Sequence, residues 1–313
     1  MSKLTTLDRK LLAELEGDPR RTNKDLARYL RVTEATVSAR IKRMEQDDLI
    51  RIIPMHDFAM IGHSALAVLD IDISGRDIDS VITALSAIDQ VLSVIMMSGT
   101  PSIIITVTER DERSLLNLIL SDIAQAAGVH CVEANVIVEI LKWQTGYGLI
   151  GTIDKEPSFP PELMAENIDL CLLHHLGPNG RMSNRQLARL AGVSADTVRQ
   201  RIMKLEEAGL LHFRLVVDAP SVPLEAMAYV RIKAEPKFTR SVAQTLRTIP
   251  SCSFVGLSLG RYSIIALFNA ATRKEIVRVI SVQVTILPGI RAINVREPAV
   301  VAKNNPYRAR LVD

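Results

Sequence analysis

The sequence predicts an α+β fold made of two similar halves, each with a small helical domain followed by a larger domain of strands and helices. The first observation behind this prediction is an internal repeat. Shifted by 161 residues, segment 7–50 aligns without a gap on segment 168–211, and about 16 of the 44 positions are identical. The second is that apolar residues recur at helical spacing over the first part of each half. The third is that short aliphatic runs alternate with helical stretches over the remainder.

The repeat and the composition set the domain boundaries. We expect a first helical domain at 1–54, a first back domain at 55–150, a linker rich in proline and polar residues at 151–165, a second helical domain at 166–216 and a second back domain at 217–313. The helical domains are called head 1 and head 2. The repeat is far longer than the 20–50 residues of a solenoid unit, so each copy is domain-sized.

The composition favours an ordinary globular protein. Hydrophobic residues make up 48% of the chain and charged residues 23%, which argues against a mostly disordered chain. The first ten residues contain no apolar signal segment, and no apolar stretch has the length of a membrane-spanning helix. Three cysteines, an odd number, imply no disulfide framework. We therefore expect a soluble cytoplasmic protein without a membrane partner.

Each head reads as three helices and a short strand. In head 1 the helices are expected at 7–18, 22–30 and 34–47, and the strand at 50–53. Head 2 repeats the pattern with a capping-box spacing from Ser183, a glycine at Gly192 for the turn between helices, and Ser194 as the cap of its third helix. Two short helices joined by a tight turn and followed by a strand predict a winged helix-turn-helix, whose third helix enters the major groove of DNA.

The outward faces of the two third helices are the candidate DNA-binding surfaces. Small residues near the start of such a helix permit close approach to base edges, and arginine or lysine farther along reaches phosphates or guanine. In head 1 the candidates are Thr33, Glu34, Ala35, Thr36, Ser38, Arg40, Lys42 and Arg43. In head 2 they are Ser194, Ala195, Asp196, Thr197, Arg199, Gln200, Arg201 and Lys204.

The charge of the heads supports DNA binding only moderately. Residues 1–54 carry 12 basic and 9 acidic residues, and residues 166–216 carry 7 and 5. Such weak fields predict that several heads must act together for useful affinity. The alternative is a three-helix packing module with solvated charges. Because the two recognition helices differ in sequence, the two DNA half-sites should differ as well.

The two heads resemble the Lrp/AsnC family of bacterial and archaeal transcription regulators. The pattern is LDxxLLxxL, then R-x-[ST]-N-x-x-LA, then V-[ST]-x-x-TV-x-x-RI, found from residue 7 and again, with isoleucine first, from residue 168. The resemblance implies double-stranded DNA as partner and a ligand-sensing RAM domain behind each head. Two fused units depart from the usual single unit. In head 1, Arg31 and Asp48 also replace the glycines present as Gly192 and Gly209, and a non-glycine in a left-handed position costs about 1 kcal/mol.

The back domains read as β-α-β-β-α-β, which predicts a ferredoxin-like sandwich. RAM domains have this order, pair through their sheets and bind amino acids or similar small effectors between subunits, as the resemblance implies. Alternation at 68–73 (VLDIDI) and 229–234 (YVRIKA) predicts first strands with one solvated face. The expected elements are 65–73, 78–87, 91–98, 102–108, 113–127 and 129–141, and then 226–234, 239–248, 253–259, 263–268, 273–286 and 289–301.

The resemblance also locates candidate effector sites in the turns between the second and third strands. The family often has glycine there, followed three residues later by aspartate, and this chain keeps the glycine but has serine at the acidic position. A serine hydroxyl cannot pair with an effector's ammonium as a carboxylate does. The alternative is that both loops are plain hairpin turns. The candidate effector-binding residues are Gly99, Thr100 and Ser102, and Gly260, Arg261, Tyr262 and Ser263.

Charge is segregated between the two back domains. Residues 55–150 contain 4 basic and 12 acidic residues, a net charge of −8, whereas residues 217–313 contain 14 and 6, a net charge of +8. Opposite fields favour contact between unlike domains. We therefore expect RAM domain 1 to pair with RAM domain 2, within one chain or between chains of a homo-oligomer. The alternative is two merely solvated faces.

The sequence gives little indication of an enzyme or a metal site. Cys171, His174 and His175 have helical ligand spacing, but one copy alone has them. Phosphate-binding and hydrolase motifs are missing from the sequence, so we expect no catalytic residue, no metal and no cofactor. The enzyme alternative is a siroheme decarboxylase, a neighbouring family with histidine, arginine and aromatics near the second and third strands. Segments 91–107 and 252–268 contain no histidine, and only Arg261 and Tyr262 match. A third alternative is a partner-binding module whose heads no longer bind DNA.

Overall fold

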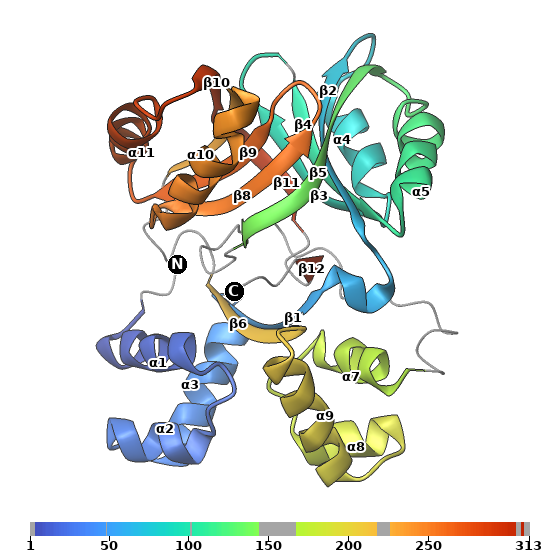
Figure 1. Cartoon of the computed structure of the whole chain (residues 1–313). Helices are drawn as coiled ribbons and strands as arrows, with labels where there is room; N and C mark the ends of the chain where they lie inside the picture. Colours follow the sequence, from blue (N-terminus) through green and yellow to red (C-terminus); the bar gives the residue numbers. More distant parts are fainter. Residues whose placement is uncertain are drawn as a thin grey trace. The chain divides into compact units, whose positions relative to one another are not determined.

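The computed structural model describes residues 4–47, 49–100, 102–143, 167–217, 226–304 and 308–309. The expected linker at 151–165 and Asp48 lie outside the described residues. The chain divides into two compact units that group domains by type (Figure 1). One unit combines 1–57 with 155–223, and the other combines 58–154 with 224–313. The two heads thus form one body and the two back domains form another.

Each head consists of three helices and a strand, as the sequence predicted. The hydrophobic core of head 1 consists of buried leucines of its first two helices against Val37, Ile41 and Met44 of the third. These three positions recur every three or four residues, which places them on one helical face. The elements of head 1 are α1 (Thr6–Gly17), α2 (Asn23–Leu30), α3 (Glu34–Gln46) and β1 (Ile50–Asp57). Those of head 2 are α7 (Ile168–Leu176), α8 (Asn184–Ala191), α9 (Ala195–Glu207) and β6 (Leu211–Val217).

The back domains have the predicted β-α-β-β-α-β order. The first contains η1 (Phe58–Ile61), β2 (Ala65–Ile73), α4 (Ile78–Ser86), β3 (Val91–Met97), β4 (Ile103–Glu109), α5 (Glu112–Asn117), η2 (Leu118–Ile123) and β5 (Val129–Trp143). The second contains β7 (Ala226–Ala234), α10 (Pro236–Thr248), β8 (Cys252–Leu259), β9 (Ile264–Ala270), α11 (Arg273–Val279), η4 (Ile280–Val284), β10 (Ile290–Arg296), β11 (Pro298–Asn304) and β12 (Arg308–Ala309).

The two back domains share one nine-stranded sheet. Its strand order is β10-β7-β9-β8-β5-β2-β4-β3-β11. Strand β5 bridges the domains, because its first part pairs with β2 and its last part with β8. In the same way, β10 pairs with β7 of the second back domain and β11 pairs with β3 of the first. Since only Glu297 separates β10 from β11, the two ends of the sheet are joined by the chain and the sheet closes into a barrel.

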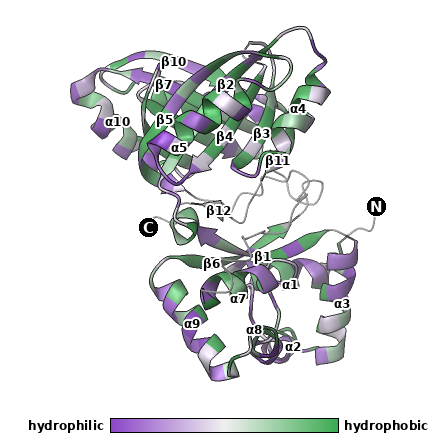
Figure 2. Cartoon of the chain, turned by 90° about the vertical axis from the view of Figure 1, so that its right-hand side faces the viewer, coloured by the Kyte–Doolittle hydropathy of each residue, from purple (hydrophilic) through white to green (hydrophobic). Residues whose placement is uncertain are grey.

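The hydrophobic core of this unit has three parts. Two clusters lie between the strands and the helices of each back domain. The third is shared and joins residues of both domains, among them Leu66, Ile104, Tyr229 and Ile265. Figures 1 and 2 show the helices outside the sheet, with hydrophobic residues concentrated on the strands. RAM domain 1 therefore pairs with RAM domain 2 within one chain, in agreement with the expectation from their opposite charges.

Two details of the sequence prediction were wrong. The first strands are buried on both faces over most of their length: Asp70 on β2 and Arg231 on β7 are only 5% and 2% exposed, and Lys233 near the end of β7 is the exposed exception among the charged residues of these two strands. Asp70 and Arg231 face the barrel interior, where the opposite back domain covers them. The last strand of the second half, expected as one element at 289–301, is interrupted at Glu297 because β11 begins at Pro298. The strand changes its partner at this point, because β10 pairs with β7 up to Arg296 and β11 pairs with β3 from Pro298 onward.

Candidate nucleic-acid interface

Both recognition helices begin at a side-chain cap. The Oγ1 of Thr33 accepts a hydrogen bond from the N–H of Thr36 at 3.1 Å, and the Oγ of Ser194 accepts one from Thr197 at 3.0 Å. The capping hydroxyl also lies 2.8 Å from the threonine hydroxyl in each head. These contacts fix the first turn of α3 and α9. Four predicted site residues therefore have a structural role as well as a place on the outward face.

The outward face of α3 is open to solvent within the head unit. Five of its candidates are exposed and three are half-buried. The exposed ones are Thr33, Glu34, Ala35, Ser38 and Lys42, and the half-buried ones are Thr36, Arg40 and Arg43. In contrast, Val37, Ile41 and Met44 on the opposite face are at most 5% exposed.

The outward face of α9 carries longer polar side chains. Ser194, Asp196, Arg199, Gln200 and Lys204 are exposed, whereas Ala195, Thr197 and Arg201 are half-buried. Asp196 accepts hydrogen bonds from Arg199 at 2.8 Å and from Gln200 at 3.4 Å. Because all three are surface side chains, these contacts are weak and easily exchanged for others.

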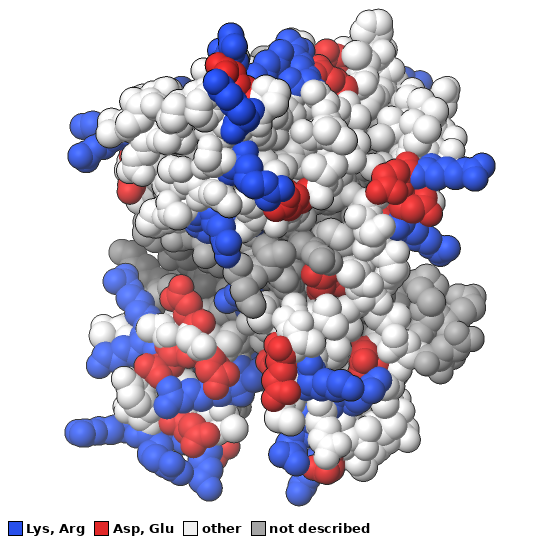
Figure 3. Space-filling model, in the orientation of Figure 1, with Lys and Arg blue, Asp and Glu red and all other residues white. Residues whose placement is uncertain are grey.

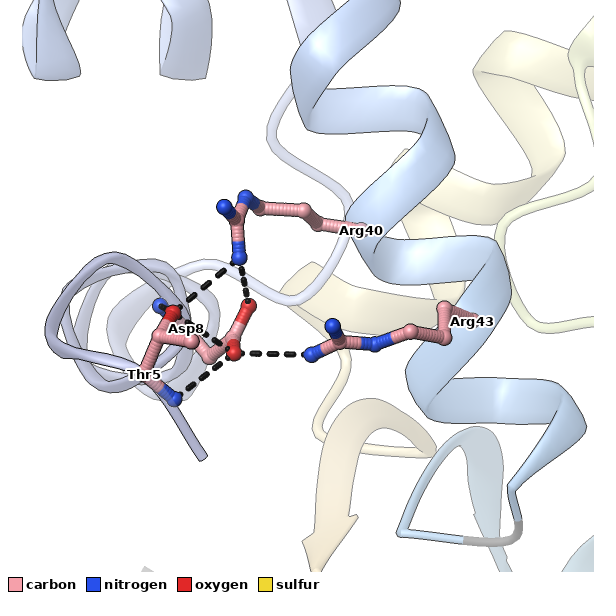
Figure 4. A network of polar contacts seen from close by, with 4 residues as sticks. All are labelled: Thr5, Asp8, Arg40 and Arg43. Carbon is pink, nitrogen blue, oxygen red and sulfur yellow. Dashed lines mark hydrogen bonds and ion pairs between the residues drawn. The ribbon is translucent and has the colours of Figure 1, made fainter. Parts of the chain in front are cut away.

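A buried carboxylate holds the third helix of head 1 against its first helix. Asp8 is fully buried, and its carboxylate receives Arg40 at 3.0 Å and Arg43 at 2.8 Å (Figure 4). The backbone N–H and hydroxyl of Thr5 donate to the same carboxylate. Burial by itself raises the pKa of Asp8, but the hydrogen bonds from Thr5, Arg40 and Arg43 outweigh it and lower the pKa to about 2.

The same connection recurs in head 2. Arg201 donates two hydrogen bonds, of 2.8 and 3.1 Å, to the carboxylate of Asp169. Asp169 and Arg201 are the repeat equivalents of Asp8 and Arg40. The identity of both residues in both copies was visible in the sequence, but we assigned Arg40 and Arg201 to DNA alone. An aspartate and an arginine 32 positions apart are present in both copies. This shared spacing was the signal that the two residues pair with each other.

The two heads are joined by an antiparallel pair of strands. β1 and β6 run against each other from Ile50 opposite Val217 to His56 opposite Leu211. Leu215 of β6 also packs on the core of head 1. The strands that follow the two recognition helices therefore pair with each other, and the heads form a single body.

Two equivalent arginines reinforce this pairing from opposite sides. Arg20 of head 1 donates to the carbonyl of Met182 at 2.9 Å and to the Oδ1 of Asn184 at 3.2 Å. Arg181 of head 2 donates to the carbonyl of Arg21 at 2.7 Å and to the Oδ1 of Asn23 at 2.8 Å. Burial lowers the pKa of both guanidinium groups.

We call this reciprocal arrangement the arginine clamp. It is formed by Arg20, Arg181, Asn23 and Asn184. Its four side chains are the R and N of the R-x-[ST]-N pattern in the two heads. The pattern was visible in the sequence, but these four residues had no predicted role. The same arginine and asparagine occur in both copies because the two heads meet at a pseudo-twofold contact. Each arginine there donates to the equivalent carbonyl and asparagine of the other head.

Charge on the heads is mixed rather than uniformly basic. On the face seen in Figure 3, lysine and arginine side chains are interspersed with aspartate and glutamate over both heads. The head surface therefore agrees with the small net charges counted from the sequence. Any duplex that it binds must be held by a few well-placed side chains on both heads together.

The candidate effector loops lie where the two back domains meet. Arg296 of the second domain donates to the carbonyls of Thr100 and Ser98 at 2.6 and 2.7 Å, next to Gly99. In the other loop, Gly260 has a φ of +148°, and a Cβ there would stand 2.6 Å from the carbonyl oxygen of Ala134. Only glycine allows this close approach.

The remaining loop residues also contact their surroundings. Arg261 forms an ion pair with Glu133 at 3.0 Å, and Tyr262 is 7% exposed with its N–H 3.3 Å from the Oδ1 of Asn135. Ser263 bonds to the backbone of β7, and half-buried Ser102 offers its carbonyl to Met97. Both loops join adjacent antiparallel strands, and each also contacts the opposite back domain, the first through Arg296 and the second through Glu133 and Asn135.

The described residues were also considered for metal ligands and for membrane-spanning helices. Within the described ranges, His, Cys, Asp and Glu side chains do not gather in a group of three or more with metal-binding geometry. The spacing of Cys171 with His174 and His175 thus forms no such group. Among the same residues, no helix has the length and apolar character needed to span a membrane.

Comparison with protein-family models matched all four domains. A model described as "Winged helix-turn-helix DNA-binding" matches residues 4–51, and the "AsnC-type helix-turn-helix domain" matches 167–206. The "Lrp/AsnC ligand binding domain" matches 66–147, and a "C-terminal dimeric alpha+beta barrel domain" matches 226–310. The four matches follow the predicted order of head, back domain, head and back domain.

Curated relatives are about half as long as this chain. An uncharacterized HTH-type transcriptional regulator of Pyrococcus furiosus is 27% identical over 148 residues, which cover 47% of this chain and 99% of that protein. The HTH-type transcriptional regulator FL11 of Pyrococcus horikoshii is 22% identical over 112 residues, 36% of this chain and 74% of that protein. One such relative thus corresponds to one half of the tandem chain.

A solved structure resembles the chain over nearly its whole length. The siroheme decarboxylase NirDL, in complex with an iron-uroporphyrin III analogue, aligns with a TM-score of 0.59 over 98% of this chain and 94% of that one. The sequence identity is 14%, so the likeness extends to the fold and no further.

Proposed function

The chain belongs to the Lrp/AsnC family, and on that premise we propose that it is a transcription regulator that binds double-stranded DNA sequence-specifically through α3 and α9. One observation carries the proposal: both recognition helices keep a solvent-exposed polar face while β1–β6 and the arginine clamp join them in one body. A duplex can therefore meet two major-groove helices at once, which offsets the weak charge of each head.

The residues proposed for DNA contact are the exposed ones. On α9 these are Ser194, Asp196, Arg199, Gln200 and Lys204, and on α3 they are Thr33, Glu34, Ala35, Ser38 and Lys42. The half-buried candidates Ala195, Thr36 and Thr197 support the helix starts, and Arg40, Arg43 and Arg201 anchor the helices through Asp8 and Asp169. We assign these six a positioning role first and a phosphate contact second.

The two heads should contribute unequally to sequence recognition. Arg199 and Gln200 stand where head 1 has Ser38 and Ala39. Arginine and glutamine form paired hydrogen bonds with guanine and adenine, whereas serine and alanine give close approach and few specific contacts. We therefore propose an asymmetric operator, with stronger base preference under head 2 than under head 1.

The experiment that tests DNA binding is a selection from random genomic fragments, followed by gel shifts on the retained sequences. Arg199→Ala and Gln200→Ala should each weaken binding to a selected site about tenfold, which is the scale of one lost base contact. Arg278→Ala on the exposed face of α11 is the matched control, because it removes one positive charge from the back domains. Retention of no fragment at low salt would reject the proposal.

Effector modulation is a further part of the proposed function. The match of residues 66–147 to a ligand-binding domain supports it, as does the position of Gly99 and Gly260 at the contact between back domains. An amino acid or related molecule bound there would contact both halves of the barrel. Thermal shift measurements with the twenty amino acids test this, and the expected result is stabilisation by one or a few of them that also changes DNA affinity.

The whole-chain likeness to NirDL favours keeping tetrapyrrole chemistry as a second candidate function. Its test is a titration with an iron tetrapyrrole followed by absorbance. A saturable spectral shift would favour the tetrapyrrole enzyme as the function. The absence of a shift would favour the transcription regulator. Segments 91–107 and 252–268 carry no histidine to ligate or orient such a molecule, so we expect no shift.

A further inference from the structure

The barrel formed by the two back domains has a pseudo-twofold axis. Ile140 of β5 pairs with Gly256 of β8, and Val301 of β11 pairs with Ile95 of β3. Each residue of the second pair is 161 positions from its counterpart in the first. The halves therefore meet through equivalent surfaces, as two identical subunits would meet in a twofold dimer.

Opposite charges occupy the equivalent positions at the centre of this contact. Asp70 and Arg231 are separated by 161 residues and form a buried ion pair with each other. Arg231 also donates to the Oδ1 of Asn294 at 2.8 Å and lies 5.0 Å from the centre of the Tyr262 ring. A residue near a twofold axis meets its own equivalent across the axis. In a like pair, aspartate would meet aspartate or arginine would meet arginine.

A second pair of opposite charges also joins the two back domains, and it too would be lost between two like domains. Glu139 of β5 receives Arg240 of α10 in two hydrogen bonds of 2.7 and 2.6 Å. The position equivalent to Arg240 in the first domain is the exposed Asp79, so two copies of the first domain would place Glu139 beside Asp79 twice. The position equivalent to Glu139 in the second domain is Val300, which would leave Arg240 without its carboxylate.

From this arrangement we propose that the positions 70/231 and 139/240 form a charge lock that lets each back domain pair with its unlike partner and rejects a copy of itself. A buried charge without a counterion is costly, and two like charges at van der Waals distance cost more. The lock makes one chain a complete barrel and keeps its first domain from pairing with the first domain of another chain. It is a specificity device, independent of whether the heads bind DNA.

The direct test reverses the central pair in the full-length chain. Asp70→Arg and Arg231→Asp each place like charges together, and each should lower the urea midpoint of the back-domain unit by about 1 M or more. The double variant Asp70→Arg/Arg231→Asp restores an opposite pair and should recover at least half of the loss. A double variant as unstable as the sum of the two single changes would overturn the proposal.

The exposed pair keeps the proposal testable if the buried variants fail to fold. Glu139→Lys and Arg240→Glu should each lower the midpoint, and the reversed pair Glu139→Lys/Arg240→Glu should regain it. Arg273 and Glu297, an exposed ion pair within the second back domain at 2.8 Å, provide the control, because reversing it leaves the contact between domains unchanged. The charge lock would be overturned if Glu139→Lys and Arg240→Glu lowered the urea midpoint equally and the reversed pair did not regain it.

Partner choice is tested with two differently tagged full-length chains. A chain with Asp70→Arg carries arginine at both central positions, and a chain with Arg231→Asp carries aspartate at both. The lock predicts that these two chains, co-expressed, co-purify by exchanging back domains, and that neither co-purifies with wild type. Equal recovery of wild type and of the complementary variant would contradict partner selection by charge.

Discussion

Arg31 is the residue at which local backbone strain can be separated from all other effects. It is the only described residue other than glycine with a positive φ, at φ 57° and ψ 44°, and it ends α2 where Gly192 ends α8. A Cβ in the left-handed region costs on the order of 1 kcal/mol. The turn of head 1 is therefore strained by its sequence, while its hydrogen bonds are those of head 2: Val32 and Val193 donate to Ala27 and Ala188 at 3.0 Å.

We predict that Arg31→Gly stabilises head 1 by up to about 1 kcal/mol, because glycine removes the strain without losing a side-chain contact that holds the turn. The measurement is hydrogen-exchange protection of the amides of α2 and α3. Gly192→Ala is the reverse control and should lower protection in head 2 by a similar amount. Unchanged exchange in both variants would mean that the two turns carry no strain.

Asp8 predicts a pH dependence for the same head. Its pKa falls from 3.8 to about 2 on folding, so the carboxylate contributes stability at every pH above 3.8 and loses it as the pH drops toward 2. The shift corresponds to about 2 kcal/mol at neutral pH. Asp8→Asn should remove this contribution and flatten the pH profile of head 1 between about pH 4 and 2.

The check on Asp8 is hydrogen exchange of α1 and α3 amides measured from pH 2 to 6 in wild type and variant. Glu16→Gln, at an exposed position of α1, is the control and should leave the profile unchanged. If Asp8→Asn kept the wild-type pH profile, the contacts of Arg40 and Arg43 with Asp8 would not be a source of stability.

At the scale of elements, most of the fold was accessible from the sequence because apolar spacing specifies helices and strands locally. The three helices of each head and the order of strands in the back domains followed from it. The sequence did not indicate which part of the molecule covers each strand. Alternation in β2 and β7 indicated two different faces, but Asp70 and Arg231 are buried by the opposite domain, and one strand's pattern carries no information about that domain.

The candidate site shows the same division. The exposed positions Ser38, Arg199 and Gln200 follow from helical periodicity alone. The inward roles of Arg40 and Arg201 depend on contacts across 32 residues of sequence, which a helical wheel does not contain. Comparison of the two copies with each other was the available signal, since a pair kept in both copies shares a structural reason.

The arginine clamp gives the prediction that belongs to the paired elements β1 and β6. Arg20→Ala with Arg181→Ala removes the charged hydrogen bonds to Met182, Asn184, Arg21 and Asn23, which lie at half-buried positions. Each lost hydrogen bond to a charged group costs about 1.5–3 kcal/mol. We expect faster hydrogen exchange along β1 and β6 with the helices of each head still protected. Arg189→Ala, an exposed arginine of α8, is the control and should change neither.

At the scale of the whole molecule, the internal repeat has produced within one chain what a homodimer makes from two. The heads pair through equivalent arginines, and the back domains pair through equivalent strands. At both contacts the halves are no longer interchangeable: the recognition helices differ at Ser38 and Arg199, and the barrel centre differs at Asp70 and Arg231. On the function proposed above, a chain of this kind would read an asymmetric DNA site in one defined direction, which a symmetric dimer cannot do.

This asymmetry predicts how the operator responds to changes in spacing. On the proposed function, β1–β6 and the arginine clamp fix α3 relative to α9, so we expect the two half-sites to lie at a fixed distance on one face of the duplex. Inserting about 5 base pairs between them turns one half-site to the opposite face and should reduce affinity to that of head 2 alone. The same insertion placed outside both half-sites should have no effect.

Gel shifts with a series of spacer lengths measure this, and the clamp variant provides the internal comparison. With Arg20→Ala/Arg181→Ala the heads are joined less tightly, so affinity for the original spacing should fall while the penalty for the insertion becomes smaller. Exchanging the two half-sites with each other should also weaken wild-type binding, because Arg199 and Gln200 would then face the sequence selected by head 1. Equal affinity for both orders, or a wild type indifferent to spacing, would show that each head binds DNA independently of the other.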